Sequence, residues 1–187
     1  MKYFKKLEGK RIYLSPMNVE DVEIFTEWMN DFYITDYIGR SYQTITLQEE
    51  KAYLEKDENN KNIFAIIDTS SNEIIGTIGL NKVDSINRTA TLGIFIGDRN
   101  YWSKGYGTEA IQLILDFGFN YLNLNNIDLA VMEFNERAIK CYKKCGFKEI
   151  GRRRKCKFLN GKYYDSILMD ILVEEFTESH IKNKNIK

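Results

Sequence analysis

The chain has 187 residues, of which 43% are apolar and 29% charged, and its 27 basic residues balance 27 acidic ones. This length and apolar content predict one compact domain and argue against a disordered chain. No apolar run approaches the roughly 18 residues that a membrane span requires. The basic start MKYFKKLEGKR is not followed by the apolar stretch of a secretion signal. We therefore expect a cytoplasmic protein without a membrane segment.

The charge and cysteine patterns disfavour a nucleic-acid site, a metal site and a His-based catalytic triad. A balanced net charge gives no general reason to expect nucleic acid as a partner, and strand alternation would divide the basic run at 152–157 (RRRKCK) between two faces. The three cysteines form no CxxC pair, and the single His lies near the end. These features predict no metal site and no His-based triad. Cys141 and Cys145, four apart on an expected helix, are either a thiol pair or small apolar fillers.

Residue patterns predict the elements in the first half of the chain. Asn18 can cap a helix, and Thr46 with Glu49 forms a capping box before a second helix. The turn TSSN at 69–72 predicts a hairpin. In chain order we expect a strand at 11–17, a helix from Asn18 to Trp28, a helix from Thr46, and strands at 63–68, 73–81 and 89–97.

The second half begins with a long amphipathic pattern. In chain order we expect a helix at 107–122, a strand at 127–132, a helix at 135–145 and a hairpin of strands 148–158 and 163–173. Gly146 suits a helix C-cap, and Asn160-Gly161 is a strong hairpin-turn signal. These elements predict an α/β domain over residues 1–176, with one mixed, largely antiparallel central sheet of about seven strands and helices on both faces. A polar, frayed tail is expected over 177–187.

The segment 100–110 (NYWSKGYGTEA) places Gly105 and Gly107 between a strand and a helix. Free backbone N–H groups at the positive end of a helix bind anions. A tight turn that needs glycine torsions is the alternative interpretation. A Walker A loop is excluded, because no GK[ST] follows Gly107.

A dinucleotide fingerprint also fits part of this loop. Gly105, Gly107 and Ala110 satisfy G-x-G-x-x-A, and Glu133 could serve as the ribose-binding acid. That fingerprint starts directly at the end of a strand, whereas seven residues (DRNYWSK) separate Gly97 from Gly105. The loop is therefore too long for dinucleotide binding.

A second motif favours coenzyme A. Residues 135–147 (NERAIKCYKKCGF) follow the pattern N-x-x-A-x-x-x-Y-x-K-x-G-F directly after a strand. With this motif and the loop YWSKGYGTEA at 101–110, the chain resembles the GNAT superfamily of acetyl-coenzyme A dependent N-acetyltransferases, and most closely its RimJ/RimL-like branch. The phrase GKYYDSILM at 161–169 also resembles that branch. The resemblance implies the GNAT fold and acetyl-coenzyme A as cosubstrate.

The resemblance assigns cofactor contacts to named positions. Backbone amides of the glycine loop would hold the pyrophosphate, at Trp102, Ser103, Lys104, Gly105, Tyr106, Gly107 and Thr108. The strand end at Phe95, Ile96 and Gly97 would pair with the pantetheine arm. Asn135 would bond the far side of that arm, and Lys144 would contact the 3′-phosphate. Most family members have Arg or Gln in place of Trp102, but backbone donors survive this change.

The chemistry requires a deprotonated amine, an oxyanion donor and a proton for the leaving thiolate. An alkylammonium has a pKa of roughly 10, so it must lose a proton before it attacks the thioester. The resemblance implies Tyr142 as the general acid and the backbone of 95–97 as the oxyanion donor. Many relatives have a Glu near the position of Thr91, which cannot act as a base. Glu133, Asp165 and a water chain are the candidate bases.

The implied acceptor is a primary amine, on a small molecule such as a polyamine or on a peptide N-terminus. A polyamine is favoured by the acidic side chains expected near the acceptor, Glu20, Asp21, Glu23, Glu27, Asp31 and Asp36. The alternative is a coenzyme A-binding module without turnover, because the Glu near position 91 is missing. We expect no nucleic-acid or membrane partner, and a monomer or a homodimer.

Overall fold

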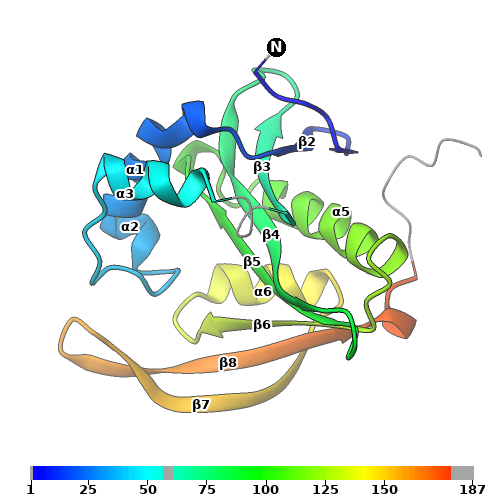
Figure 1. Ribbon diagram of the computed structural model, residues 1–187. Helices are drawn as coiled ribbons and strands as arrows, with labels where there is room; N and C mark the ends of the chain where they lie inside the picture. The colour runs from blue at the N-terminus through cyan, green and yellow to red at the C-terminus, as the bar shows by residue number, and fades with distance from the viewer. Residues whose placement is uncertain (1, 57–60, 178–187) are drawn as a thin grey trace, which may run out of the picture.

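The computed structural model describes residues 2–56 and 61–177, which form one mixed sheet with helices on both faces (Figure 1). The strands are β1 (Leu7–Glu8), β2 (Ile12–Pro16), β3 (Ile63–Asp68), β4 (Ile74–Asp84), β5 (Thr89–Ile96), β6 (Asn126–Met132), β7 (Lys148–Leu159) and β8 (Lys162–Leu172). The α-helices are α1 (Val22–Asn30), α2 (Phe32–Thr35), α3 (Leu47–Leu54), α5 (Tyr106–Asn120) and α6 (Glu136–Lys144). Short 3₁₀ turns lie at η1 (Val19–Asp21), η2 (Arg99–Tyr101) and η3 (Val173–Glu175).

The described strands make an eight-stranded sheet in the order β1-β2-β3-β4-β5-β6-β8-β7. Of its neighbouring pairs only β5 and β6 are parallel, and they pair over just three residues, Thr89–Thr91 against 126–128. The predicted α/β class with a single mixed sheet is confirmed. The sheet has one strand more than the expected seven because β1, two residues long, is too short to show an alternating pattern.

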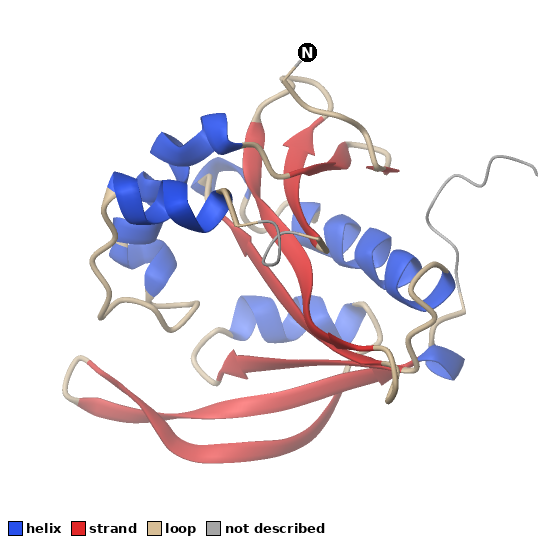
Figure 2. Cartoon of the chain, viewed as in Figure 1, coloured by secondary structure: helices blue, strands red, loops and turns tan. Residues whose placement is uncertain are grey.

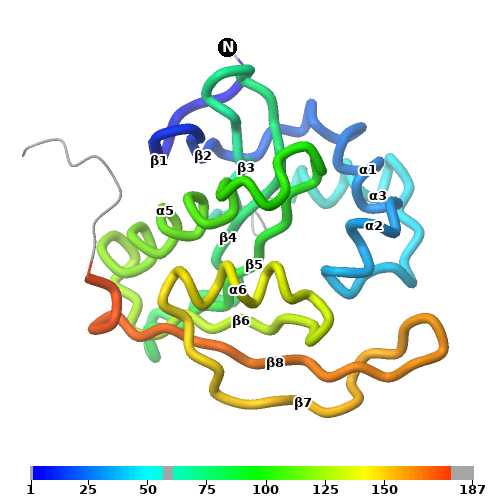
Figure 3. Tube along the Cα trace, turned by 180° about the vertical axis from the view of Figure 1, so that it is seen from behind, coloured from blue at the N-terminus to red at the C-terminus, as the bar shows by residue number. Residues whose placement is uncertain are grey.

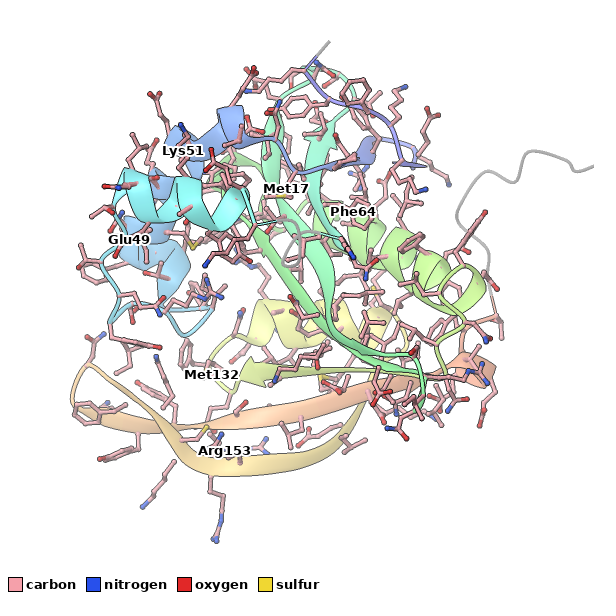
Figure 4. The ribbon with its side chains drawn as sticks, viewed as in Figure 1. Met17, Glu49, Lys51, Phe64, Met132 and Arg153 are labelled. Atoms are coloured by element: carbon pink, nitrogen blue, oxygen red, sulfur yellow. The ribbon has the colours of Figure 1, made fainter. Side chains whose placement is uncertain are left out.

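Two hydrophobic layers hold the helices against the sheet. Helices α5 and α6 lie together on one face, as the view in Figure 3 shows, and α5 buries a broad apolar stripe there. The ring of Phe64 on β3 packs against Phe117 of α5, with centroids 5.7 Å apart. On the other face, Phe25 and Trp28 of α1 pack with Leu54 of α3 in a second cluster. Helix α3 turns Glu49 and Lys51 outward into solvent (Figure 4).

The helix starts and turns follow the predicted signals, with two exceptions (Figure 2). The capping box of Thr46 and Glu49 is present at α3, and Asn160-Gly161 turns the β7–β8 hairpin with φ of 50° and 78°. Asn18 caps the 3₁₀ turn η1 instead of starting an α-helix, and α1 begins at Val22. Helix α2 was not expected, because four residues are too few for a periodic pattern.

Apart from Thr177, the predicted tail lies outside the described residues. In the part of the chain that the structure covers, no helix is both long and apolar enough to cross a membrane. Within the same ranges, no three His, Cys, Asp or Glu side chains gather in a way that could hold a metal ion.

Candidate active site

The central feature of the sheet is the divergence of β5 and β6 beyond their short parallel pairing. Figure 1 shows the two strands meeting at one end and separating toward the other, with α6 behind the opening. The space between them opens into a cleft of about 950 Å³. Its walls are β5, the glycine loop, α6 and the region of α2 and α3, which contributes Tyr37, Arg40 and Tyr53.

The glycine loop brings the start of α5 to this cleft. Gly105 caps α5 with φ of 87° and ψ of 0°, a left-handed conformation that glycine adopts without strain. Ser103, also at positive φ, lines the cleft together with Gly107 and Thr108. The first backbone N–H groups of a helix have no partner within the helix, so this loop can bind an anion.

An ion pair between Arg11, which directly precedes β2, and Glu109 of α5 fixes the loop. Arg11 donates from Nε to Glu109 Oε2 at 3.0 Å and from Nη1 to the Lys104 carbonyl oxygen at 2.9 Å. Glu109 Oε1 also accepts the backbone N–H groups of Lys10 and Arg11, at 2.6 and 2.8 Å. The guanidinium of Arg11 lies 4.4 Å from the ring centre of Tyr106. Glu109 lies within GTEA, but no local pattern in the sequence indicates its contact with the distant Arg11.

Glu109→Gln is expected to lower the free energy of unfolding by about 1–2 kcal/mol at pH 7, since hydrogen bonds to a charged acceptor are stronger than neutral ones. Burial raises the pKa of Glu109, but the hydrogen bonds from Arg11 and Lys10 outweigh it and lower the pKa. The ionised carboxylate therefore stabilises the fold above the unfolded-state pKa of about 4.3. This stabilisation is lost as the pH falls through the lower folded-state pKa.

Urea unfolding of both proteins at pH 7 and near pH 3 measures this difference. The gap between wild type and Glu109→Gln should shrink at the lower pH. Glu55→Gln is the matched control, because the Glu55 side chain is 56% exposed. A gap that is the same at both pH values would contradict the assigned role of the Glu109 charge.

The edge of β5 that faces the cleft is set by strand alternation. The N–H of Gly97 donates to the Ile75 carbonyl oxygen at 2.9 Å, so it faces β4 and is not free for a ligand. Because successive residues of a strand direct their backbone groups to opposite edges, Ile94 and Ile96 face the cleft. The carbonyl oxygen of Ile96 accepts a hydrogen bond from Nε1 of Trp102 at 2.8 Å. The free N–H groups toward the cleft are therefore at 94 and 96.

Packing against α1 explains why residue 97 is a glycine. A Cβ atom at this position would overlap the indole ring of Trp28. Trp28 is buried and also packs edge-on against Phe95, with ring centroids 5.9 Å apart. Gly97 thus allows close contact between β5 and α1, and it is not one of the residues that line the cleft.

Helix α6 supplies the opposite wall of the cleft. Asn135 caps this helix, with Oδ1 accepting the Ala138 N–H at 3.2 Å, and it lines the cleft with Lys144. The guanidinium of Arg137 stacks 3.7 Å from the ring centre of Trp102, and burial lowers the pKa of this guanidinium. Arg137 is not among the site residues predicted from the sequence, although it lies within the NERA motif, the first four residues of the 135–147 pattern.

Tyr142 lies on the same helix and lines the cleft while only 9% of it is exposed. Its ring packs against Phe147 at a centroid distance of 5.8 Å. Burial raises the pKa of Tyr142 well above its ordinary value, and the nearby Cys141 and Cys145 add to this shift. The phenol therefore keeps its proton at neutral pH, as a proton donor must.

The two carboxylates considered as bases are held in the sheet instead of the cleft. Glu133 Oε1 accepts the backbone N–H of Asp165 at 2.8 Å, and Asp165 Oδ1 accepts the N–H of Lys155 at 2.8 Å. Nη1 of Arg152 lies 3.5 Å from Glu133 Oε2 and 3.9 Å from Asp165 Oδ2. Neither carboxylate lines the cleft, so the structure does not bring them together with Tyr142.

The acidic residues taken as a sign of a polyamine acceptor also lie elsewhere. A separate groove of about 870 Å³ is lined by Glu20, Asp21, Glu23, Glu27 and Asp31. None of these residues, nor Asp36, lines the cleft between β5 and α6. The acidic density therefore gives no support for a polycation in the cleft.

The structure thus brings most, but not all, of the predicted positions together. The cleft is lined by Phe95, Ile96, Trp102, Ser103, Gly105, Gly107, Thr108, Asn135, Tyr142 and Lys144. Outside its lining lie Gly97, Lys104, Tyr106, Glu133 and Asp165. Arg11 contacts both the Lys104 carbonyl oxygen and the ring of Tyr106, which supports the loop conformation.

The glycine loop predicted from the sequence lies at the open end of the diverging pair β5 and β6. The sequence model of the acetyltransferase (GNAT) domain family matches residues 11–148. The chain belongs to the GNAT acetyltransferase family. It is an N-acetyltransferase, and neither a dinucleotide enzyme nor a binding module without turnover is favoured.

Relatives of this acetyltransferase support the assignment. It is 30% identical over 174 residues to the uncharacterized N-acetyltransferase p20 of Bacillus licheniformis, covering 91% of this chain and 97% of that one. It is 35% identical over 108 residues to the spermidine N(1)-acetyltransferase of Escherichia coli K12, covering 58% of each chain. A solved structure of spermidine N-acetyltransferase from Vibrio cholerae, in complex with CoA and spermine, superposes with a TM-score of 0.80 at 28% identity. That match covers 89% of this chain and 98% of that one.

Proposed function

We propose that this N-acetyltransferase transfers the acetyl group of acetyl-coenzyme A directly to a primary amine on a small molecule, and that it belongs to the RimJ/RimL-like branch. The observation that carries the proposal is the cleft between β5 and α6, with the glycine loop at the start of α5. The branch assignment rests on the loop YWSKGYGTEA at 101–110.

The cleft offers groups suited to each part of coenzyme A. Backbone amides from Ser103 to Thr108 would hold the pyrophosphate, and Lys144 would add a positive charge for a phosphate. The backbone N–H groups of Ile94 and Ile96 on the cleft edge of β5 would bond the pantetheine arm, as one strand pairs with another. Asn135 would contact the arm from α6, although its Oδ1 already accepts the Ala138 N–H.

The reaction then requires three proton or charge events. The amine arrives as an ammonium with a pKa of roughly 10 and must lose a proton. Since Glu133 and Asp165 are held in the sheet, we assign this step to solvent water. A backbone N–H at 94 or 96 would stabilise the oxyanion, and Tyr142 would protonate the leaving thiolate.

Ligand-induced stabilisation tests the cofactor assignment. Acetyl-coenzyme A at a hundred times its dissociation constant is expected to add about 2.7 kcal/mol to the free energy of unfolding, because it binds only the folded state. NADH at the same concentration should leave the melting temperature unchanged. Stabilisation by NADH alone would overturn the assignment.

A thiol-release assay separates turnover from binding. Spermidine, a monoamine and a peptide with a free N-terminus would be supplied in turn with acetyl-coenzyme A, and release of free coenzyme A would be followed. Amine-dependent release supports transfer to that class of acceptor. Stabilisation by the cofactor without release for any amine would favour a module that binds coenzyme A and has lost turnover.

A further inference from the structure

Two neighbouring cysteines that the acetyl transfer does not use lie at the wall of the cleft formed by α6. Cys141 lines the cleft, and its Sγ lies 3.3 Å from the Thr108 hydroxyl oxygen of α5. Cys145, one turn later on α6, has its Sγ 3.8 Å from the Thr108 carbonyl oxygen. Both sulfur atoms therefore lie against the first turn of α5, where the glycine loop ends.

The neighbours of the two thiols favour negative charge on Cys141 over Cys145. Interaction with the neighbouring Cys145 side chain lowers the pKa of Cys141, whereas interaction with Cys141 and burial raise the pKa of Cys145. The Thr108 hydroxyl, Lys144 and Arg137 lower the pKa of Cys141 further and outweigh its burial. Lys144 acts on Cys145 as well, but Thr108 and Arg137 favour charge on Cys141. Of the two sulfur atoms, Cys141 Sγ therefore has the surroundings that favour a thiolate.

We propose that Cys141 is a covalent modification site for low-molecular-weight disulfides, and that its modification blocks the cofactor cleft. In this step the Cys141 Sγ thiolate attacks one sulfur of R–S–S–R. A new Cys141–S–S–R bond forms, the old S–S bond breaks, and the released RS⁻ takes a proton from water. The disulfide supplies the oxidising equivalent, and cysteine reactivity of this kind requires a thiolate with access to solvent.

The position of the sulfur explains why an adduct would block binding. A Cβ atom placed on Gly107 would lie 3.9 Å from Cys141 Sγ, so the sulfur is in contact distance of the glycine loop. Any group attached there occupies the space above Gly107 and Thr108, where the proposed pyrophosphate site lies. This part of the inference rests on the proposed function, since it assumes that coenzyme A uses this loop.

The chain offers a matched control in Cys156, an exposed thiol on β7 outside the cleft. The full-length protein is treated with limiting dithiodipyridine, with and without saturating coenzyme A, and the modified cysteine is identified by peptide mass mapping. At pH 7 we expect Cys141 to react about fivefold faster than Cys156. Coenzyme A should slow Cys141 at least about tenfold, as a bound ligand in excess covers the site, and leave Cys156 unchanged.

Two substitutions at position 145 test the origin of the reactivity. Cys145→Ala removes the polar side chain that neighbours Cys141, whereas Cys145→Ser keeps a hydroxyl in its place. The rate of alkylation of Cys141 by iodoacetamide, followed against pH, should have its midpoint at higher pH in Cys145→Ala and near the wild-type value in Cys145→Ser. Cys141→Ser should retain thermal stabilisation by coenzyme A after treatment with the disulfide, whereas wild type should lose it.

Preferential modification of Cys156 or Cys145 would overturn the proposal. So would a Cys141 that reacts equally fast when thermal shift shows coenzyme A bound. If coenzyme A causes no thermal shift in the untreated protein, the proposed function fails instead, and the alkylation profiles still decide whether Cys141 is the reactive thiol.

Discussion

Tyr142→Phe is expected to reduce turnover by roughly 100-fold or more, the usual contribution of a positioned general acid. The substitution keeps the buried ring and its packing against Phe147 but removes the one proton donor assigned to the leaving thiolate. Affinity for acetyl-coenzyme A should stay within a few-fold. Steady-state kinetics with an acceptor amine, together with cofactor titration, measure both effects.

Two comparisons make this experiment specific. Tyr101→Phe removes another hydroxyl from the cleft lining without touching the assigned chemistry, so its turnover should stay close to that of the wild type. The defect of Tyr142→Phe should also shrink with a thioester whose leaving thiol is more acidic, because that thiolate needs its proton less. Wild-type turnover in Tyr142→Phe would remove this residue from the mechanism and leave the acid role to water.

Gly107→Val is expected to weaken binding of acetyl-coenzyme A by about 100-fold, which corresponds to about 2.7 kcal/mol of lost contact. A Cβ atom at this position meets only Cys141 Sγ at 3.9 Å and Ile94 Cδ1 at 4.0 Å, both ordinary contact distances. The fold therefore tolerates the new side chain, but the branched methyl groups occupy the surface on which a phosphate would sit.

Gly151→Val is the matched control for this change, since no other atom lies within 4 Å of a Cβ placed on Gly151. Circular dichroism should show both variants folded, and only Gly107→Val should lose its thermal stabilisation by acetyl-coenzyme A. Unchanged cofactor affinity in Gly107→Val would show that the loop is a turn and not an anion site.

Local signals determined the elements that carry this site. Backbone torsions and caps depend on neighbouring residues, so the capping box of Thr46 and Glu49 and the turn at Asn160-Gly161 could be predicted from the sequence. The same holds for Gly105 at the start of α5, where a positive φ is needed. The glycine loop at 101–110 and the NERA motif are each continuous in the sequence. Together they indicated the family.

Only the tertiary structure decided which of these residues face the cleft. Glu133 and Asp165 were candidate bases from the sequence, but pairing of β6 with β8 places the Asp165 N–H on the Glu133 carboxylate and the Glu133 N–H on the Asp165 carbonyl oxygen. Arg11 and Glu109 are 98 residues apart, and their ion pair exists because β2 passes beside the start of α5. Gly97 was expected to contact a ligand, yet its N–H bonds β4 and its missing side chain admits Trp28. Composition and spacing specify local geometry, whereas contacts between distant segments depend on how the sheet brings those segments together.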